Sequence, residues 1–443
     1  MRSKFHQHSE TRPRKSPCYC DRVSITSSAM NSSAPCLLLS SRKSLGFAFL
    51  FLFSTAFAPL ARGGEAEIIP KDSPASKALS FPLSYTGEGF ANLSGGYKRG
   101  AIYEGLLSVG VQGDLDKLIG WQGGSFLISG IYPHGSSLTD NYTHDFNRVS
   151  NIDAYDSVRL YEAWLQQEFV DGKVSLRLGQ ILADAEFFVS DSGALFLNGA
   201  FGAIPLVAQN LNAPVYPVAA PGLRLRLLAS ESFSVQAGVF SGAGDQATEN
   251  RHGVDWRLGS EGMLAITEVA YKWNSEKEST GLPGVFKVGG FFQSGESHEA
   301  FPDPQSRGDD GGYLVVDQQL WRKPGSEDQG LSGFLRIGGA PGDRNVVPFY
   351  FDTGFNFKGL LPGRNKDIAG IGLSYTKLSG NLSDENGEPL EAHREAILEA
   401  TYKVVLNDWC NVQPDFQYIF NPGASQNAPN AIVVGLRVNL TFQ

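Results

Sequence analysis

The last stretch of the chain alternates between apolar and other side chains with a period of two. Apolar side chains stand at positions 432, 434, 436, 438, 440 and 442, and Arg437, Asn439 and Thr441 lie between them. A period of two places the two sets on opposite faces of a β-strand. Eleven residues also match a tilted strand that crosses a bilayer, which needs about 9–11. The end of the chain therefore predicts a strand that is long enough to span a membrane.

The same alternation recurs at 174–178, 223–227, 233–239, 398–406 and 412–420. A secreted β-sandwich alternates too and is the alternative fold. Two features favour a barrel: arginine, glutamate and glutamine in mid-strand suit a water-filled lumen, and aromatic residues at strand ends suit the two membrane interfaces. Charged residues are only 19% of the chain, against about a quarter in soluble domains. We predict an all-β fold, a transmembrane antiparallel β-barrel with long outer loops and short periplasmic turns.

An apolar run at 45–60 follows Arg42 and Lys43, which is the pattern of a secretory signal peptide. An uncleaved membrane anchor is the alternative, although a spanning helix needs about 20 residues. We expect a leader over 1–66, a short flexible lead-in over 67–85 and a single barrel over 86–443, exported to a bacterial outer membrane. The length allows roughly 14 to 18 strands. The expected outer loops are 132–157, 183–221, 241–262, 295–312, 379–394 and 421–430.

Several long segments, in this order along the chain, carry a family resemblance. They are GDLDKL at 113–118, GWQGGSF at 120–126, RLYEAWL at 159–165, VSLRLGQ at 174–180, YPVAAPG at 216–222 and VQPDFQYI at 412–419. With these segments the chain resembles the carbohydrate-selective porins of the OprB family. The resemblance implies a 16-stranded outer-membrane barrel through which monosaccharides diffuse, with a preference for glucose-like sugars. The chain departs from the usual aromatic C-terminus, because Gln443 follows Phe442.

Strand parity nominates residues for a substrate pathway. A sugar needs hydrogen-bonding groups for its hydroxyls and an aromatic ring for its less polar face. In 158–169 the odd positions, Tyr161 among them, are the more apolar and should face lipid. An arginine facing lipid at mid-depth costs about 2–4 kcal/mol, so the arginines of 174–178 and 223–227 should face the lumen. The predicted pathway residues are Glu162, Trp164, Gln166, Arg177, Arg224 and Arg226.

We expect Arg224, Arg226, Glu162 and Trp164 near a constriction, which the segment 183–221 narrows by folding inward. The alternatives are that these side chains only solvate the lumen, and that the segment packs over the rim.

Other kinds of site find little support. The histidines show no metal-binding spacing, no Gly-x-Ser-x-Gly elbow occurs, and Cys410 is the one cysteine after the leader. A net charge of −9 argues against nucleic acid as a partner. We therefore expect no cofactor, no metal and no enzyme activity. The expected partners are carbohydrates and membrane lipid, with a homotrimer by analogy to other large porins. A less selective or anion-biased porin, and a barrel enzyme or adhesin, are the alternatives.

Overall fold

The computed structural model describes most of the chain from residue 77 onward. The described residues are 77–243, 250–256, 258–259, 262–275, 279–295, 308–382, 393–425 and 427–442. The expected leader, 1–66, lies outside them.

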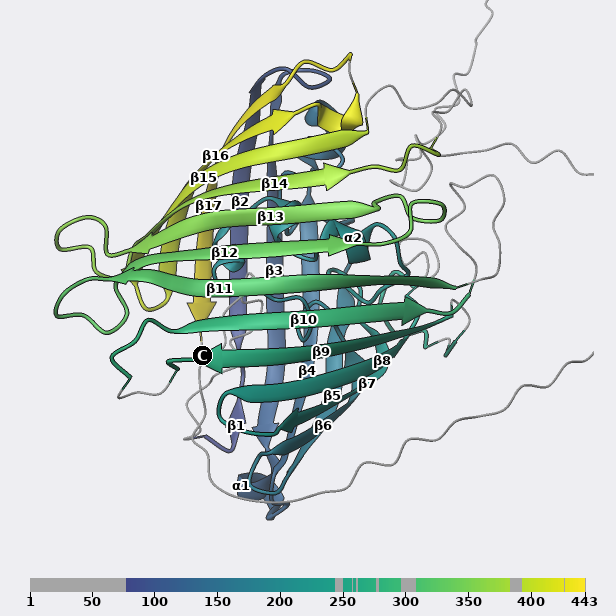
Figure 1. Ribbon diagram of the computed structural model, residues 1–443, viewed down its shortest axis with the longest axis vertical. Coiled ribbons are helices and arrows are strands. Elements are labelled where there is room, and N and C mark those ends of the chain that lie inside the picture. The colour runs from purple at the N-terminus through teal and green to yellow at the C-terminus, as the bar shows by residue number, and fades with distance from the viewer. Residues whose placement is uncertain are drawn as a thin grey trace, which may run out of the picture.

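Sixteen strands form one closed antiparallel barrel (Figure 1). Each strand pairs with the next along the chain, and β17 closes the barrel by pairing with β2. The strands are β2 (Leu83–Ser94), β3 (Gly100–Asp114), β4 (Gly124–Gly135), β5 (Arg159–Phe169), β6 (Val174–Ile181), β7 (Ala220–Leu228), β8 (Phe233–Ser241), β9 (Met263–Trp273), β10 (Gly284–Gln293), β11 (Asp309–Arg322), β12 (Gly330–Gly339), β13 (Phe349–Lys358), β14 (Ile368–Lys377), β15 (Arg394–Asn407), β16 (Cys410–Phe420) and β17 (Ala431–Phe442). The predicted fold class is confirmed.

The first described strands begin earlier than the expected barrel boundary at residue 86. The two-residue strand β1 (Leu79–Ser80) pairs with β3, where Leu79 lies opposite Gly113. Strand β2 follows at Leu83. Residues 79–80 and 83–85 of the expected lead-in, 67–85, are therefore strand, because they pair with β3 and β17.

Short and long connections alternate around the barrel. At one end the chain turns tightly, as between β5 and β6, where Val170, Asp171 and Gly172 all have positive φ. Much longer connections join strands at the other end, such as 136–158 between β4 and β5 and 182–219 between β6 and β7. Short helical turns occupy some connections: α1 (Leu115–Ile119), η2 (Thr139–Thr143), η3 (Gly193–Leu195), η4 (Gly199–Phe201), α2 (Pro205–Ala208) and η5 (Pro422–Ala424). Among the described residues, no helix is both long and apolar enough to cross a membrane.

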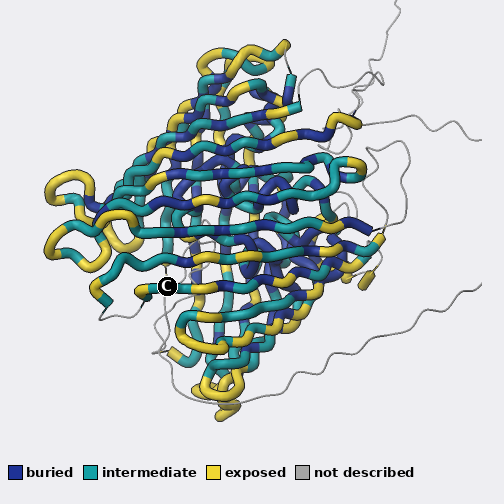
Figure 2. The backbone as a smooth tube through the Cα atoms, in the orientation of Figure 1, coloured by how far each residue is buried: buried dark blue, intermediate teal, exposed yellow. Residues whose placement is uncertain are grey.

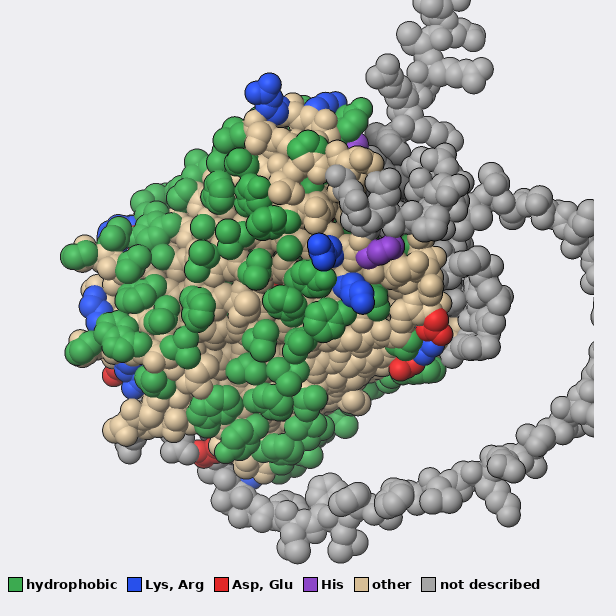
Figure 3. Space-filling view, turned by 45° about the horizontal axis from the view of Figure 1, so that its top comes forward, with side chains coloured by type: hydrophobic (Ala, Val, Ile, Leu, Met, Phe, Trp, Pro, Cys, Tyr) green, Lys and Arg blue, Asp and Glu red, His purple; other side chains and the backbone are tan. Residues whose placement is uncertain are grey.

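The period of two sorts the side chains of the wall. On β7, Leu223, Leu225 and Leu227 are 39–45% exposed, whereas Arg224 between them is fully buried. Figure 2 shows the same alternation of exposed and buried residues along neighbouring strands. Hydrophobic side chains cover much of the outer surface in Figure 3. The outside is therefore the apolar face, as a bilayer requires.

A break in the parity lies on β5, opposite β4. On β4, Ile128 pairs with Ala163 and Gly130 pairs with Leu160, so Tyr161 and Glu162 share a single opposing residue. This β-bulge inserts one residue and lets both side chains turn inward. Tyr161 is 2% exposed and its ring lies 6.2 Å from that of Tyr216. The expectation that Tyr161 faces lipid is wrong, because a bulge is invisible to a strict period of two.

Candidate functional site

Two long connections fold into the barrel and fill much of its lumen. We call residues 136–158, between β4 and β5, the first inner loop, and residues 182–219, between β6 and β7, the second inner loop. The second carries apolar side chains that pack on the far wall. The Phe196 and Phe201 rings lie 5.7 and 6.3 Å from the ring of Phe334 on β12. Of the two arrangements that the sequence left open, the loop that folds inward is the one observed.

Carboxylates of the barrel wall bind backbone amides of the inner loops. A loop inside a barrel has few strand partners, so its N–H groups need other acceptors. An ionised carboxylate is a strong one. These bonds run from Phe188 N to Glu268 Oε2 (3.0 Å), Ser192 N to Asp317 Oδ1 (3.0 Å), Leu197 N to Glu399 Oε1 (2.6 Å), Asn198 N to Glu399 Oε2 (3.0 Å), Phe146 N to Glu395 Oε2 (2.6 Å) and Asn147 N to Glu395 Oε1 (2.8 Å).

Arg336 on β12 is a donor instead, and it binds backbone carbonyls of the second inner loop. Its Nη1 donates to Gly202 O at 2.9 Å and its Nη2 to Phe201 O at 2.7 Å. Its Nε donates to both oxygens of Asp352, at 3.1 and 3.0 Å. Both side chains are almost fully buried. The second inner loop is therefore fixed through its backbone at many points of the wall.

A second ionic cluster joins this loop to β5, β6 and β7. Glu186 of the loop accepts from Arg177 Nη1 at 2.6 Å and pairs with Arg224 Nε at 3.1 Å. Gln166 Oε1 accepts from both arginines, at 2.8 and 3.0 Å from Arg177 and 3.1 Å from Arg224. We call these four residues the arginine cluster. Its arginine side chains are at most 5% exposed, and the Glu186 carboxylate is the counterion that both of them contact.

Most of the predicted pathway residues meet at this cluster. Arg177 lies 3.9 Å above the Trp164 ring, and Trp164 Nε1 donates to Glu162 Oε1 at 3.2 Å. Together with Gln166 and Arg224, five of the six nominated side chains are connected. Arg226, two residues further along β7, makes no hydrogen bond through its buried Nε. It takes no part in the contacts described for the cluster.

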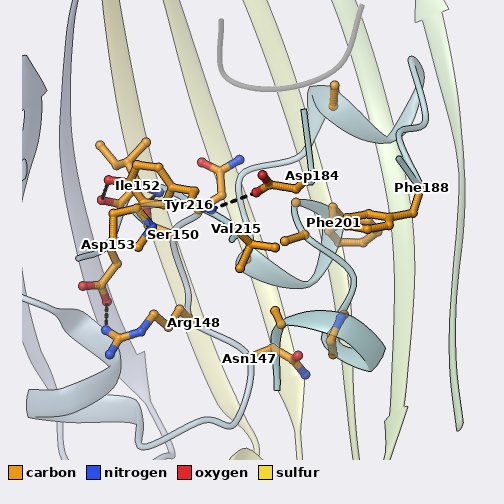
Figure 4. A pocket seen from close by; sticks show the side chains of 18 of the residues that line it. Asn147, Arg148, Ser150, Ile152, Asp153, Asp184, Phe188, Phe201, Val215 and Tyr216 are labelled. Atoms are coloured by element: carbon orange, nitrogen blue, oxygen red, sulfur yellow. Dashed lines mark hydrogen bonds and ion pairs between the residues drawn. The ribbon is translucent and has the colours of Figure 1, made fainter. Parts of the chain in front are cut away.

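A cavity of about 230 Å³ lies between the two inner loops (Figure 4). Arg148 and Asp153 form an ion pair at 2.8 Å on one side. On the other, Asp184 accepts the backbone N–H of Tyr216 at 2.9 Å. Its lining also includes aromatic rings. Burial, followed by the nearby Glu104 carboxylate, raises the pKa of Tyr216 well above its usual range, so the phenol stays protonated.

Sequence reasoning missed most of this lining. Arg148, Asp153 and Asp184 lie on loops, where no period assigns a side chain to the lumen. Tyr216 begins the segment YPVAAPG of the resemblance and lies in 183–221, the segment expected to fold inward, but neither prediction assigns its side chain to a cavity. The unusual density of proline and alanine in YPVAAPG was the one available signal.

A family model described as "Carbohydrate-selective porin, OprB family" matches residues 98–442. The chain belongs to the OprB family. The family match and the closed β-barrel both indicate an outer-membrane channel, so the protein is a bacterial outer-membrane porin. The predicted family and location are confirmed.

Individual relatives agree with the family. "Porin B" of Pseudomonas aeruginosa is 27% identical over 411 residues, which cover 83% of this chain and 88% of the relative. "Putative porin QuiX" of Acinetobacter baylyi is 22% identical over 415 residues, with coverages of 86% and 92%. The high-pH structure of Pseudomonas putida OprB superimposes with a TM-score of 0.74 at 25% identity, covering 82% of this porin and 94% of that chain.

Among the described residues of this porin, no group of three or more His, Cys, Asp and Glu side chains could hold a metal ion. The relatives are porins, and several buried ionic side chains of the wall bind the inner loops.

The first inner loop should respond to pH through Asp145. Burial raises the pKa of this carboxyl to about 7, although hydrogen bonds from Thr143 and Thr139 favour its ionised form. An unfolded aspartate titrates near 3.9. The loop is therefore stabilised most at acidic pH, and that stabilisation is lost as the pH rises through about 7. We expect amide hydrogens of 139–150, corrected for intrinsic rates, to exchange several-fold faster at pH 8 than at pH 5.5.

Asp145→Asn should remove this pH difference, because an amide stays neutral throughout. Asp140→Asn, on the exposed side of the same loop, should leave it in place. Equal protection of the loop at both pH values in the unmodified porin would contradict the prediction.

Proposed function

We propose that this porin passes uncharged monosaccharides, with a preference for glucose-like sugars, by passive diffusion. The observation that carries the proposal is the cavity between the inner loops. Its walls combine opposite charges, hydroxyl and amide groups with aromatic rings. Sugar hydroxyls exchange hydrogen bonds with such groups as they lose water, and a ring face can rest on an aromatic. Passage also requires that binding stay weak.

The arginine cluster supports a preference for uncharged solutes. Glu186 offsets part of the charge of Arg177 and Arg224 at hydrogen-bond distance. We propose that Glu162, Trp164, Gln166, Arg177 and Arg224 define the shape and charge of the pathway beside the cavity, and that Arg226 adds a positive charge nearby. A passage with balanced charges favours neither sign of ion strongly, so size and hydrogen bonding decide what passes.

Liposome swelling tests the proposal. Vesicles that contain the refolded porin are diluted into glucose, maltose or a charged sugar acid of glucose size. We expect glucose to enter faster than its size alone predicts, and the sugar acid to enter more slowly than glucose. Entry rates that follow size alone would reduce the protein to a general diffusion porin.

A matched pair of variants links the rate to the pathway. Trp164→Leu removes the indole beside Arg177, and Trp409→Leu removes an exposed indole from the turn between β15 and β16. The first should reduce the preference for glucose over maltose at least two-fold, and the second should not change it. An equal effect of both would argue that the lumen indole has no part in selection.

The specific observation behind an anion-biased alternative is the surplus of arginine on β6 and β7. Three arginines, Arg177, Arg224 and Arg226, stand on these strands, whereas Glu186 pairs with two of them and Glu162 accepts from Trp164. A reversal potential in a salt gradient separates the two functions, because an anion-biased pore gives a large potential and a balanced one gives a small potential.

A further inference from the structure

The barrel wall has a gap where the second inner loop leaves it. Strand β6 ends at Ile181, where the chain turns into the lumen, and Ala163 pairs with Gln180. Strand β5 begins at Arg159, so its first three residues extend past the end of β6. Backbone groups on such an edge cannot be left unpaired against hydrocarbon, because nothing there can bond them. The gap must therefore be covered from elsewhere.

A segment of the connection between β8 and β9 covers it. We call residues 250–256 the outer strap. His252 O accepts the backbone N–H of Leu160 at 2.9 Å. Gly253 has φ +68° and approaches β5 so closely that a Cβ would lie 2.4 Å from Leu160 O. Asn250 ties the strap to itself, with its amide bonded to Asp255 O and Asp255 N at 2.9 Å each.

The strap lies on the outer side of the wall. Gln180 shares its face of β6 with Leu178, which is 57% exposed, yet Gln180 is only 1% exposed. Its amide nitrogen donates to Leu160 O and Tyr161 O at 3.0 and 3.1 Å, and its oxygen accepts from Trp256 Nε1 at 2.5 Å. The strap thus buries a polar residue that otherwise points out of the barrel.

The strap exposes large apolar side chains beside the polar Arg251, His252 and Asp255. Val254 is 69% exposed and Trp256 is 50% exposed, and beside them Val158 and Leu258 are 66% and 75% exposed. This patch continues the exposed apolar row of the wall that includes Leu178. Large apolar side chains gathered on one surface usually mark a binding surface. Here the continuous surface is the one that meets lipid.

We propose that the outer strap is seated in the outer membrane, where it closes the gap in the wall and Val254 and Trp256 contact lipid acyl chains. The occupant is lipid because the apolar patch is continuous with the lipid-facing wall, and the exposed Arg251, His252 and Asp255 of the strap can extend towards the polar headgroups. The second inner loop leaves the wall at the end of β6, and the strap covers the resulting gap from the outside. This inference does not depend on which solute the porin passes.

Tryptophan fluorescence tests whether Trp256 of the strap contacts lipid acyl chains. The porin is reconstituted in vesicles with phosphatidylcholine brominated on its acyl chains, and the emission lost on Trp256→Phe is isolated by difference. We expect this emission to be quenched by the brominated lipid more than two-fold and to resist aqueous iodide. Trp164→Phe provides the control, because Trp164 lies inside the barrel and its emission should not respond to the brominated lipid. A Trp256 emission that iodide quenches and brominated lipid does not would overturn the proposal.

Two glycine variants test whether the close contact of Gly253 with β5 holds the strap in the membrane. Gly253→Ala should displace the strap from Leu160 and move the Trp256 emission from lipid quenching to iodide quenching. Gly259→Ala has nearly the same positive φ, +74°, but among the described residues its Cβ meets only Met263 Sδ, at 3.8 Å, so it should leave the quenching unchanged. Lipid quenching that survives Gly253→Ala would show that the contact with β5 does not hold the strap in the membrane.

Discussion

Replacing Arg336 with methionine is expected to raise the ion conductance of the channel several-fold. Methionine fills a similar volume but cannot donate to Phe201 O and Gly202 O of the second inner loop. It also leaves Asp352 buried without its cation, a change that costs about 3–5 kcal/mol when one partner of a buried pair is removed. The loop should then leave the wall, and single-channel recording in a planar bilayer should register a wider and noisier pore.

Two further variants separate the loop from general damage to the barrel. Arg336→Met with Asp352→Leu removes both charges, so most of the stability should return while the conductance stays high. Lys358→Met breaks only an exposed pair with Asp328 and should change neither quantity. An unchanged conductance in folded Arg336→Met would mean that the carboxylate contacts alone hold the loop.

The parts of this structure that follow a rigid repeat could be predicted from the sequence. Strand alternation is fixed by backbone geometry, so Arg177 and Arg224 could be assigned to the inner face from the leucines beside them. The same rule placed Trp164 and Gln166 on the inner face correctly, because the alternation is unbroken on their side of the bulge. It failed at Tyr161, which lies on the other side of the bulge, where one extra residue shifts the parity of the strand.

The inner loops lie beyond such reasoning. Their anchors are backbone amides and carbonyls bound to wall residues about 80 to 250 positions away, as in the contact of Phe146 N with Glu395. Nearly every residue has a backbone amide, so no side-chain pattern in the loop sequence predicts which residues make these contacts. Glu186 lies in 183–221, the segment that the sequence expects to fold inward, but its two partners on β6 and β7 become its neighbours only when the loop has folded inward.

Replacing Glu186 with glutamine should turn the passage towards anions. The carboxylate stands between two buried guanidinium groups, at 2.6 Å from Arg177 and 3.1 Å from Arg224, and an amide of the same shape leaves both charges without their counterion. The charge can then be relieved only if water or an anion enters, and the loop loosens to admit it. In a tenfold potassium chloride gradient we expect the reversal potential to shift towards the chloride equilibrium potential, and the sugar acid to enter liposomes faster relative to glucose.

The matched control is Glu327→Gln, which removes the same charge from an exposed turn between β11 and β12. Its reversal potential should equal that of the unmodified porin, because an exposed charge outside the lumen is screened by salt. If Glu186→Gln also leaves the potential unchanged, the two arginines act only as loop anchors, and their field does not reach the permeating solute. A shift confined to Glu186→Gln would instead mean that one loop residue sets both the position of the second inner loop and the charge of the pathway beside it.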